Sequence, residues 1–200
     1  MNPQLWQPRL ARDDDIPALE RLIPLSVRGL QAGWYSPAQM EAALGTVFAV
    51  DRQLIRDRTY YVVESGGAIV GSGGWSRRRS LYGGDALRAE PDPLLDPNVD
   101  AARVRAFFVH PQWARRGIGR SIMMECERGI MAAGFARVEI VATLAGEPLY
   151  AQFGYQVVER YAIGMKEGLE LPAVRMSKRM ARTNYPEEIA RIENATGKID

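Results

Sequence analysis

The fold of this chain is decided by residues 104–121, VRAFFVHPQWARRGIGRS. Residues 104–109 are mostly apolar, with β-branched and aromatic side chains, and predict a strand. Residues 121–128 place apolar side chains at helical spacing and predict a helix. A strand that turns through such a loop into a helix directs free backbone N–H groups and the positive end of the helix dipole at one place. The stretch therefore predicts an anion-binding loop suited to phosphate.

The loop itself carries glycines and arginines. Gly117 and Gly119 have no side chain to keep a pyrophosphate away from the backbone. Arg115, Arg116 and Arg120 can add charge-assisted hydrogen bonds. A Walker A loop is excluded because no Gly-Lys-Ser/Thr follows, and a dinucleotide fingerprint because its third glycine is missing. The remaining alternative is an ordinary basic turn.

Together, Val109-His110-Pro111, the run Arg116-Gly117-Ile118-Gly119 and the helix that follows resemble the acyl-coenzyme A pyrophosphate loop of the GNAT acetyltransferases. The family's pattern begins with Arg or Gln, and here that position is Ala114. The resemblance implies that Arg115, Arg116, Gly117, Ile118, Gly119 and Arg120 hold the pyrophosphate of acetyl-CoA. It also implies that backbone groups of Phe107, Phe108 and Val109 pair with the pantetheine amides.

A second motif, Leu149-Tyr150-Ala151-Gln152-Phe153-Gly154-Tyr155, resembles the family's aromatic-Tyr-x-x-x-Gly-Phe segment. The resemblance implies a short helix beside the pantetheine arm, with Tyr150 as general acid for the departing thiolate. A thiol has a pKa of about 8.5 and a phenol of about 10, so the proton transfer is chemically reasonable. Thr143 stands where family members often carry Asn, and it retains a hydrogen-bonding group. The alternative is that Tyr150 is a core residue.

Composition excludes several classes of protein. The chain has 200 residues, of which 46% are hydrophobic and 25% charged, as in an ordinary soluble globular domain. A net charge of +2 gives no reason to expect nucleic acid as a partner. One cysteine and one histidine exclude a disulfide framework and make a metal site unexpected. No apolar run approaches the roughly 18 residues of a membrane span, and no signal pattern opens the chain, so a cytoplasmic location is expected.

The remaining segments indicate one α+β domain over residues 1–180 and a tail over 181–200 with a possible helix at 186–192. Pro24 is expected to kink or split the first helix. The glycines of residues 71–74 suggest a bulge or a close neighbour in their strand. The segment 77–102 reads as a long loop. The expected elements are a strand at 5–11, helices near 16–28, 36–44 and 51–55, a hairpin at 60–75, and, after the central strand and helix, a strand at 137–142, a helix at 147–153 and strands at 156–163 and 173–180.

The resemblance to the GNAT family implies its fold, a mixed and mostly antiparallel sheet that is splayed at the central strand and flanked by helices. It implies direct acetyl transfer from acetyl-CoA to an amine of a small molecule, through a tetrahedral intermediate, without a metal. Two alternatives stay open: a peptide or protein N-acetyltransferase, and a non-catalytic acyl-CoA-binding module. A homodimer is common in the family.

The acceptor side is less readable. Trp34, Tyr35, Trp75 and Tyr82 are candidates to line it, although each also fits ordinary packing. Arg77, Arg78, Arg79 and Arg105 suggest an acidic acceptor, or else, for the first three, a solvated charge run. Glu64 and Glu139 are candidate general bases, because arginines occupy the central strand where the family often has a carboxylate. Cys126 reads as a core residue and His110 as a loop residue.

Overall fold

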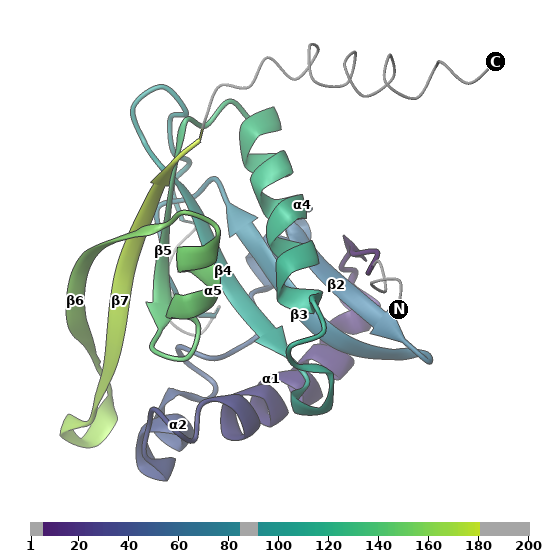
Figure 1. The fold of residues 1–200 in the computed structure, drawn as a ribbon, viewed down its shortest axis with the longest axis vertical. Coiled ribbons are helices and arrows are strands. Elements are labelled where there is room, and N and C mark those ends of the chain that lie inside the picture. The colour runs from purple at the N-terminus through teal and green to yellow at the C-terminus, as the bar shows by residue number, and fades with distance from the viewer. Residues whose placement is uncertain (1–5, 85–91, 181–200) are drawn as a thin grey trace.

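A computed structural model describes residues 6–84 and 92–180 of the chain. Within these residues, one seven-stranded sheet has the order β1-β2-β3-β4-β5-β7-β6 (Figure 1). Its neighbouring strands are antiparallel except for β4 and β5, which are parallel. The strands are β1 (Arg9–Leu10), β2 (Tyr60–Ser65), β3 (Ala68–Ser76), β4 (Ala102–Val109), β5 (Arg137–Thr143), β6 (Gln156–Gly164) and β7 (Glu170–Arg179).

Helices cover both faces of this sheet, so that it separates two hydrophobic clusters (Figure 1). One cluster lies under α4 and α5 and the other under α1, α2 and α3. The helices are η1 (Asp13–Asp15), α1 (Ile16–Leu30), α2 (Pro37–Ala43), α3 (Arg52–Arg56), η3 (Pro111–Trp113), α4 (Ile118–Ala132), α5 (Glu147–Gln152) and η4 (Lys166–Gly168). None of the helices in the described residues is long and apolar enough to cross a membrane.

The central pair of strands separates partway along its length. β4 and β5 pair only through Ala102 to Val104 opposite Val138 to Ile140, and the ladder then stops. Figure 1 shows the two arrows diverging beyond this point, with α5 in front of the opening. The predicted α+β fold with a sheet splayed at its central strand is confirmed.

An irregularity in β4 lies at the same level. Ser72 pairs with Phe108 and Gly74 with Arg105, so two residues of β4 stand opposite the single residue Gly73. Ala106 adopts a left-handed conformation with φ of 62°. The extra residue on this side is therefore in β4. On its other side β3 has an extra residue of its own, because Val63 pairs with Gly71 and Glu64 with Ile69, which leaves Val70 unmatched, so the bulge expected in the glycine strand is confirmed against β2. The glycine serves as the close neighbour, since a Cβ on Gly73 would lie 2.7 Å from the Phe107 ring.

Two local expectations need correction. α1 continues through Pro24 without splitting. Proline removes only the hydrogen bond to the carbonyl of Glu20, and Glu20 lies on the exposed side of the helix, where water can replace that bond. The first strand is shorter than expected, because only Arg9 and Leu10 pair with β2.

The segment expected to be a long loop is tied down where the structure describes it. Arg78 and Leu94 form an isolated antiparallel bridge, and Leu95 N–H donates to the Arg77 carbonyl at 2.8 Å. Arg78 also forms an ion pair with Asp57 at 2.6 Å. The described ends of this segment therefore lie side by side. The possible tail helix at 186–192 falls outside the described residues.

Candidate active site

The predicted phosphate loop has the backbone geometry of an anion site. Gly117 is the N-cap of α4 with φ of 86°, in the left-handed region that favours glycine. α4 begins at Ile118, and no side chain caps it. The first N–H groups of a helix have no partner within it, so those of α4 are available to a ligand. A Cβ on Gly117 would meet no atom closer than 3.9 Å, so space remains over this backbone.

Three basic side chains surround this helix start. Arg115, Arg116 and Arg120 are exposed, and none forms an ion pair with a residue in the described ranges. The Arg116 guanidinium carbon lies 4.9 Å from the centroid of the Trp113 ring. The Arg120 guanidinium carbon lies 5.7 Å from that of Phe153 on the α5 side. Their charges add to the helix dipole and favour a ligand with several negative charges.

A residue from the beginning of the chain holds the loop. The Trp6 indole N–H donates to the Arg116 carbonyl at 2.6 Å. The Trp6 ring meets Trp113 edge to face, with centroids 5.7 Å apart. The sequence motifs do not reveal this contact, because 110 positions separate the two hydrogen-bonded residues.

The end of β4 presents backbone groups in two directions. His110 N–H donates to Val70 of β3 at 2.9 Å, and alternation along the strand turns the N–H of Phe108 to the same side. The N–H groups of Phe107 and Val109 then point away from β3, to the side from which β5 has diverged. That of Val109 donates to Ser26 Oγ of α1 at 3.1 Å. Val109 N–H is therefore used within the protein, and Phe107 N–H remains, of the three predicted contacts, as the group on the side of the gap between β4 and β5.

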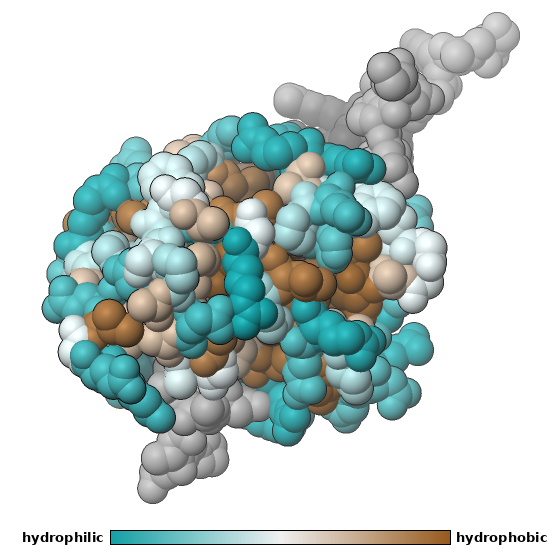
Figure 2. Space-filling view, turned by 90° about the horizontal axis from the view of Figure 1, so that it is seen from below, coloured by the Kyte–Doolittle hydropathy of each residue, from teal (hydrophilic) through white to brown (hydrophobic). Residues whose placement is uncertain are grey.

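A cavity of about 70 Å³ lies at the opening between the two strands. Its wall combines β4, β5, β7, α5, the end of α1 and the segments around Phe48 and Tyr82. Figure 2 views the molecule from the end where α1 and α2 lie, and shows hydrophobic side chains gathered in the middle of this face between hydrophilic ones. The two motifs predicted from sequence thus lie along one path, since β4 runs from this cavity to the phosphate loop.

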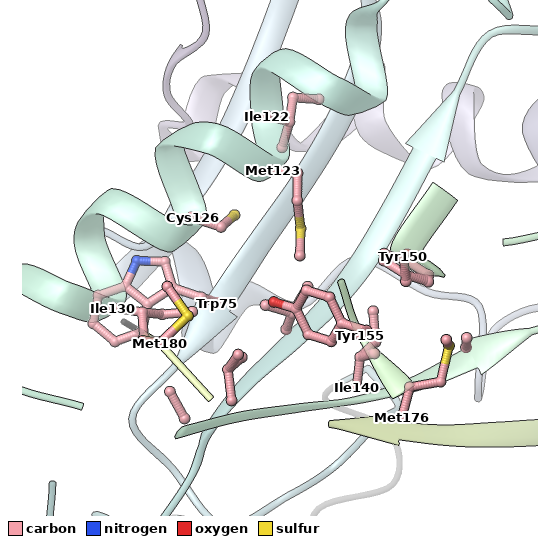
Figure 3. Packing of buried hydrophobic residues seen from close by; sticks show 14 of the residues in the cluster. Trp75, Ile122, Met123, Cys126, Ile130, Ile140, Tyr150, Tyr155, Met176 and Met180 are labelled. Carbon is pink, nitrogen blue, oxygen red and sulfur yellow. The ribbon is translucent and has the colours of Figure 1, made fainter. Parts of the chain in front are cut away.

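Tyr150 reaches this cavity from α5. Its side chain is 5% exposed, and its ring meets Phe107 and Tyr155 edge to face at 6.0 and 6.2 Å between centroids. Figure 3 shows it beside Tyr155, Ile140 and Met176 in the packed interior. The hydroxyl makes no hydrogen bond to any residue in the described part of the chain. Burial raises the pKa of Tyr150 well above that of a free phenol, so the hydroxyl keeps its proton at neutral pH.

Thr143 also lines the cavity, at the end of β5. Its Oγ1 accepts a hydrogen bond of 3.2 Å from Gly146 N–H, which precedes α5. A Cβ on Gly146 would lie 3.1 Å from the Tyr150 ring. Thr143 therefore fixes the turn that carries Tyr150 to the cavity.

The structure brings only some of the acceptor-side candidates together. Tyr35 and Tyr82 line the cavity. Trp34 is 55% exposed and Trp75 is buried against Gly129 and Phe135, and neither contributes to the cavity wall. Neither tryptophan therefore shares the described cavity wall with Tyr150, although Trp75 belongs to the same hydrophobic cluster.

The glutamates predicted as general bases do not line the cavity that contains Tyr150. Glu64 is exposed on β2 and forms an ion pair with Arg9 of the edge strand β1. Glu139 pairs with Arg103 at 2.5 Å and with Arg175 at 3.4 Å. No carboxylate is among the described residues that line the cavity.

Arg105 is the charged residue in the described wall of the cavity, and its charge is already matched. It forms ion pairs with Asp51 at 2.8 Å and Asp92 at 3.8 Å, with 3% of its side chain exposed. Arg77 and Arg79 are exposed and do not line the cavity. The arginines therefore do not form the cationic acceptor site that an acidic acceptor requires.

Gln31 is a further residue of the cavity wall that no sequence motif indicates. This residue follows α1, is 7% exposed and lines the cavity. Nothing in its sequence surroundings distinguishes it from a helix end, so only the packing of α1 against β4 reveals it.

Comparison with known proteins agrees with this geometry. Residues 56–157 match the family model described as acetyltransferase (GNAT) domain. The chain belongs to the GNAT acetyltransferase family. No curated protein sequence matches it significantly.

Solved structures of this family share the fold. A GCN5-related N-acetyltransferase from Rhodopseudomonas palustris has a TM-score of 0.66 at 20% identity, covering 90% of this chain and 99% of that one. PaiA N-acetyltransferase from Thermoplasma acidophilum, solved in complex with coenzyme A, has 0.59 at 12% identity, covering 88% and 100%. YncA from Salmonella typhimurium, solved with its cofactor acetyl-CoA, has 0.56 at 18% identity, covering 90% and 96%.

Proposed function

We propose that this protein transfers the acetyl group of acetyl-CoA directly to the amine of a small molecule. The observation that carries the proposal is the position of Tyr150, which lines a cavity from which β4 leads to the phosphate loop and whose hydroxyl has no hydrogen-bond partner among the described residues. The coenzyme A and acetyl-CoA present in the PaiA and YncA structures support the choice of donor.

The residues present fit acetyl-CoA. The N–H groups at the start of α4, with Arg115, Arg116 and Arg120, offer donors and positive charge to a pyrophosphate. The edge of β4 beyond Val104 lacks the ladder to β5, so it can pair with the amides of a pantetheine arm. Next to the bulge at Ala106, we assign the N–H of Phe107 to the oxyanion of a tetrahedral intermediate.

Acetyl-CoA supplies a thioester, whose carbonyl carbon is attacked by the amine and whose sulfur leaves as a thiolate. The phenolic hydroxyl of Tyr150 donates a hydrogen bond to that sulfur. Because the raised pKa of Tyr150 exceeds the roughly 8.5 of a thiol, complete proton transfer from the phenol is uphill. The hydroxyl therefore stabilises the developing thiolate mainly by a charge-assisted hydrogen bond.

The amine must lose a proton before it attacks. For an alkylammonium of pKa about 10.4, neutralisation at pH 7 costs about 4–5 kcal/mol. Since no carboxylate lines the described part of the cavity, we assign this step to a chain of water molecules leading to solvent.

Two alternatives have different requirements. A peptide N-acetyltransferase needs an open groove for an extended chain, whereas aromatic and aliphatic side chains wall the cavity here. A non-catalytic acyl-CoA-binding module does not need the Tyr150 hydroxyl. The aromatic cavity and this hydroxyl favour the small-molecule enzyme. No described residue points to the homodimer expected from the resemblance.

The test is calorimetric titration with acetyl-CoA, with free CoA alongside. Gly117→Glu places a strained, negatively charged residue in the loop and is expected to abolish micromolar binding. Gly134→Glu is the matched control, because Gly134 has φ of 85° at the opposite end of the same helix, about 22 Å away. Absence of binding to the wild type, or equal loss in both variants, would overturn the assignment of the loop.

Catalysis is tested separately by thiol release with a panel of amines. The wild type is expected to release CoA only when an amine is present, and Tyr150→Phe to release it far more slowly while binding acetyl-CoA normally. Tight binding with no release for any amine would favour the non-catalytic module.

A further inference from the structure

The side chain of Gln31 contains a buried acceptor without a donor. Its backbone is fully used: the N–H donates to the Val27 carbonyl, and the carbonyl accepts from Trp34 and Tyr35. The side-chain oxygen Oε1 is buried and has no hydrogen-bond partner among the described residues. Leaving a buried carbonyl oxygen unpaired costs free energy, and natural proteins do so rarely. A ligand that donates to this oxygen would remove that cost.

Of the other polar side chains in the described cavity wall, those of Tyr35 and Thr143 already form hydrogen bonds within the protein, and Tyr82 is only partly buried. The Tyr35 hydroxyl donates to the Pro172 carbonyl at 2.7 Å and accepts from Leu144 N–H at 2.9 Å. Thr143 Oγ1 accepts from Gly146. Gln31 Oε1 and the Tyr150 hydroxyl therefore remain as polar atoms of nearly buried residues that can serve a ligand.

The rest of the wall is largely apolar. The side chains that face a ligand there come from aromatic and aliphatic residues, chiefly Phe48, Tyr82, Phe107, Ile140, Ile163 and Leu171. Such a wall favours burial of the apolar part of a bound amine. It offers no partner to a further charged group on that amine. The cation of Arg105 already pairs with Asp51 and Asp92. A carboxylate in the cavity would find no uncommitted cation in the described wall, and a second ammonium would find no anion.

We propose that Gln31 Oε1 accepts a hydrogen bond from the amine acceptor, and that this acceptor carries its amine on an aromatic or aliphatic body without a carboxylate or a second ammonium. The inference rests on the proposed acetyltransferase function and specifies the substrate class of the same site. Tyr150 then serves the donor sulfur and Gln31 the acceptor, both from the wall of the same cavity.

Three probe amines test the substrate class. 2-Phenylethylamine has the proposed character, phenylalanine adds only a carboxylate to it, and spermidine is a polycation. With saturating acetyl-CoA, we expect kcat/KM for 2-phenylethylamine to exceed that for each of the others by at least about tenfold, since an unpaired buried charge is costly. Preference for phenylalanine or spermidine, or transfer to none of the three by a protein that binds acetyl-CoA, would overturn the substrate class. Failure to bind acetyl-CoA would instead overturn the proposed function.

Gln31→Met tests the residue, because it keeps the side-chain length and removes the oxygen. KM for 2-phenylethylamine is expected to rise about 2–10-fold, the range for one hydrogen bond, while KM for acetyl-CoA stays unchanged. Gln31→Glu keeps acceptor oxygens, and the amine of the bound acceptor is the partner of its carboxyl group, so KM for 2-phenylethylamine should not rise. Gln156→Met, at an exposed glutamine of β6, is the matched control.

Unfolding separates a binding role from a structural one. Removing an unpaired buried oxygen should leave Gln31→Met at least as resistant to urea as the wild type. A destabilised Gln31→Met, or one with unchanged KM for the amine, would overturn the assignment of Gln31.

Discussion

Arg105 and Asp51 form an ion pair inside the protein, with 2.8 Å between Nε and Oδ2 and with 3% and 1% of their side chains exposed. Asp51 also caps α3, because its carboxylate accepts from Leu54 N–H at 3.3 Å. Asp92 approaches the same guanidinium, and Arg105 donates to the Ser80 carbonyl at 2.6 Å. The pair therefore joins the central strand to α3 and to both described ends of the segment 77–101.

Replacing this arginine should be strongly destabilising. Arg105→Met leaves two buried carboxylates without their cation, and the expected loss is about 3–5 kcal/mol of unfolding free energy. Urea denaturation measures it, with Arg79→Met at an exposed arginine as the control. A loss below about 1 kcal/mol would mean that water or another cation takes over.

Trp6→Phe should weaken acetyl-CoA binding while leaving the fold intact. Phenylalanine keeps an aromatic ring against Trp113 but loses the N–H that holds the Arg116 carbonyl. One hydrogen bond corresponds to an increase in Kd of about 2–10-fold. Calorimetry measures it, and Trp34→Phe, at an exposed tryptophan outside the cavity wall, is the control. Equal Kd values for wild type and Trp6→Phe would show that the loop holds its shape alone.

Ionisation of Tyr150 should not lower kcat on the alkaline side of its pH profile. The phenol acts in its protonated form, and burial raises its pKa, so it retains its proton to a higher pH than a free phenol of about 10. We expect kcat to show no decline from this group below about pH 10. Tyr150→Phe should lower kcat by about 10²-fold or more with little change in KM for acetyl-CoA. A fall in kcat near pH 8 that disappears in Tyr150→Phe would contradict the protonated role.

Asp57 should contribute stability that is lost in acid. Burial alone would raise the pKa of Asp57, but hydrogen bonds from Arg78 and Gln53 outweigh it and lower the pKa below the usual value. A depressed carboxylate pKa stabilises the folded state above the unfolded value of about 3.9, and the contribution disappears as pH falls through the folded value. Urea denaturation should therefore give a higher free energy of unfolding for the wild type than for Asp57→Asn at pH 7, and this difference should disappear toward pH 3. The same comparison with Asp14→Asn, at an exposed aspartate, should show little change.

Much of the fold was predictable because local chemistry decides it. Ser36 and Pro37 begin α2, Asp51 caps α3, Gly134 ends α4, and the glycines at 66 and 67 turn the β2–β3 hairpin. Each of these signals acts within four residues along the chain, so the sequence alone displays it. Cys126 is fully buried in the core, as its helical spacing indicates.

Features set by tertiary surroundings were harder to predict. Pro24 is tolerated because the carbonyl it leaves unpaired lies on the exposed side of α1. The glycines of β3 indicated the irregularity that β3 has against β2, but the second extra residue is in β4, where the sequence carries no such signal.

The candidate site divides in the same way. Its loop and Tyr150 belong to contiguous motifs and were named from sequence, and their roles stay predictions. Trp6 and Gln31 reach the loop and the cavity only through packing between distant segments. The charge on Arg105 suggested a ligand, whereas its aspartate partners come from other parts of the chain.

The early end of the β4–β5 ladder has a thermodynamic consequence. Backbone groups that neighbouring strands would otherwise satisfy are left to water or to a ligand beyond Val104. Any molecule that pairs with them binds the folded state alone, and at a hundredfold excess over its Kd it adds about 2.7 kcal/mol to the free energy of unfolding. The resistance of this protein to heat and proteolysis is thus coupled to the concentration of the molecule that occupies the gap.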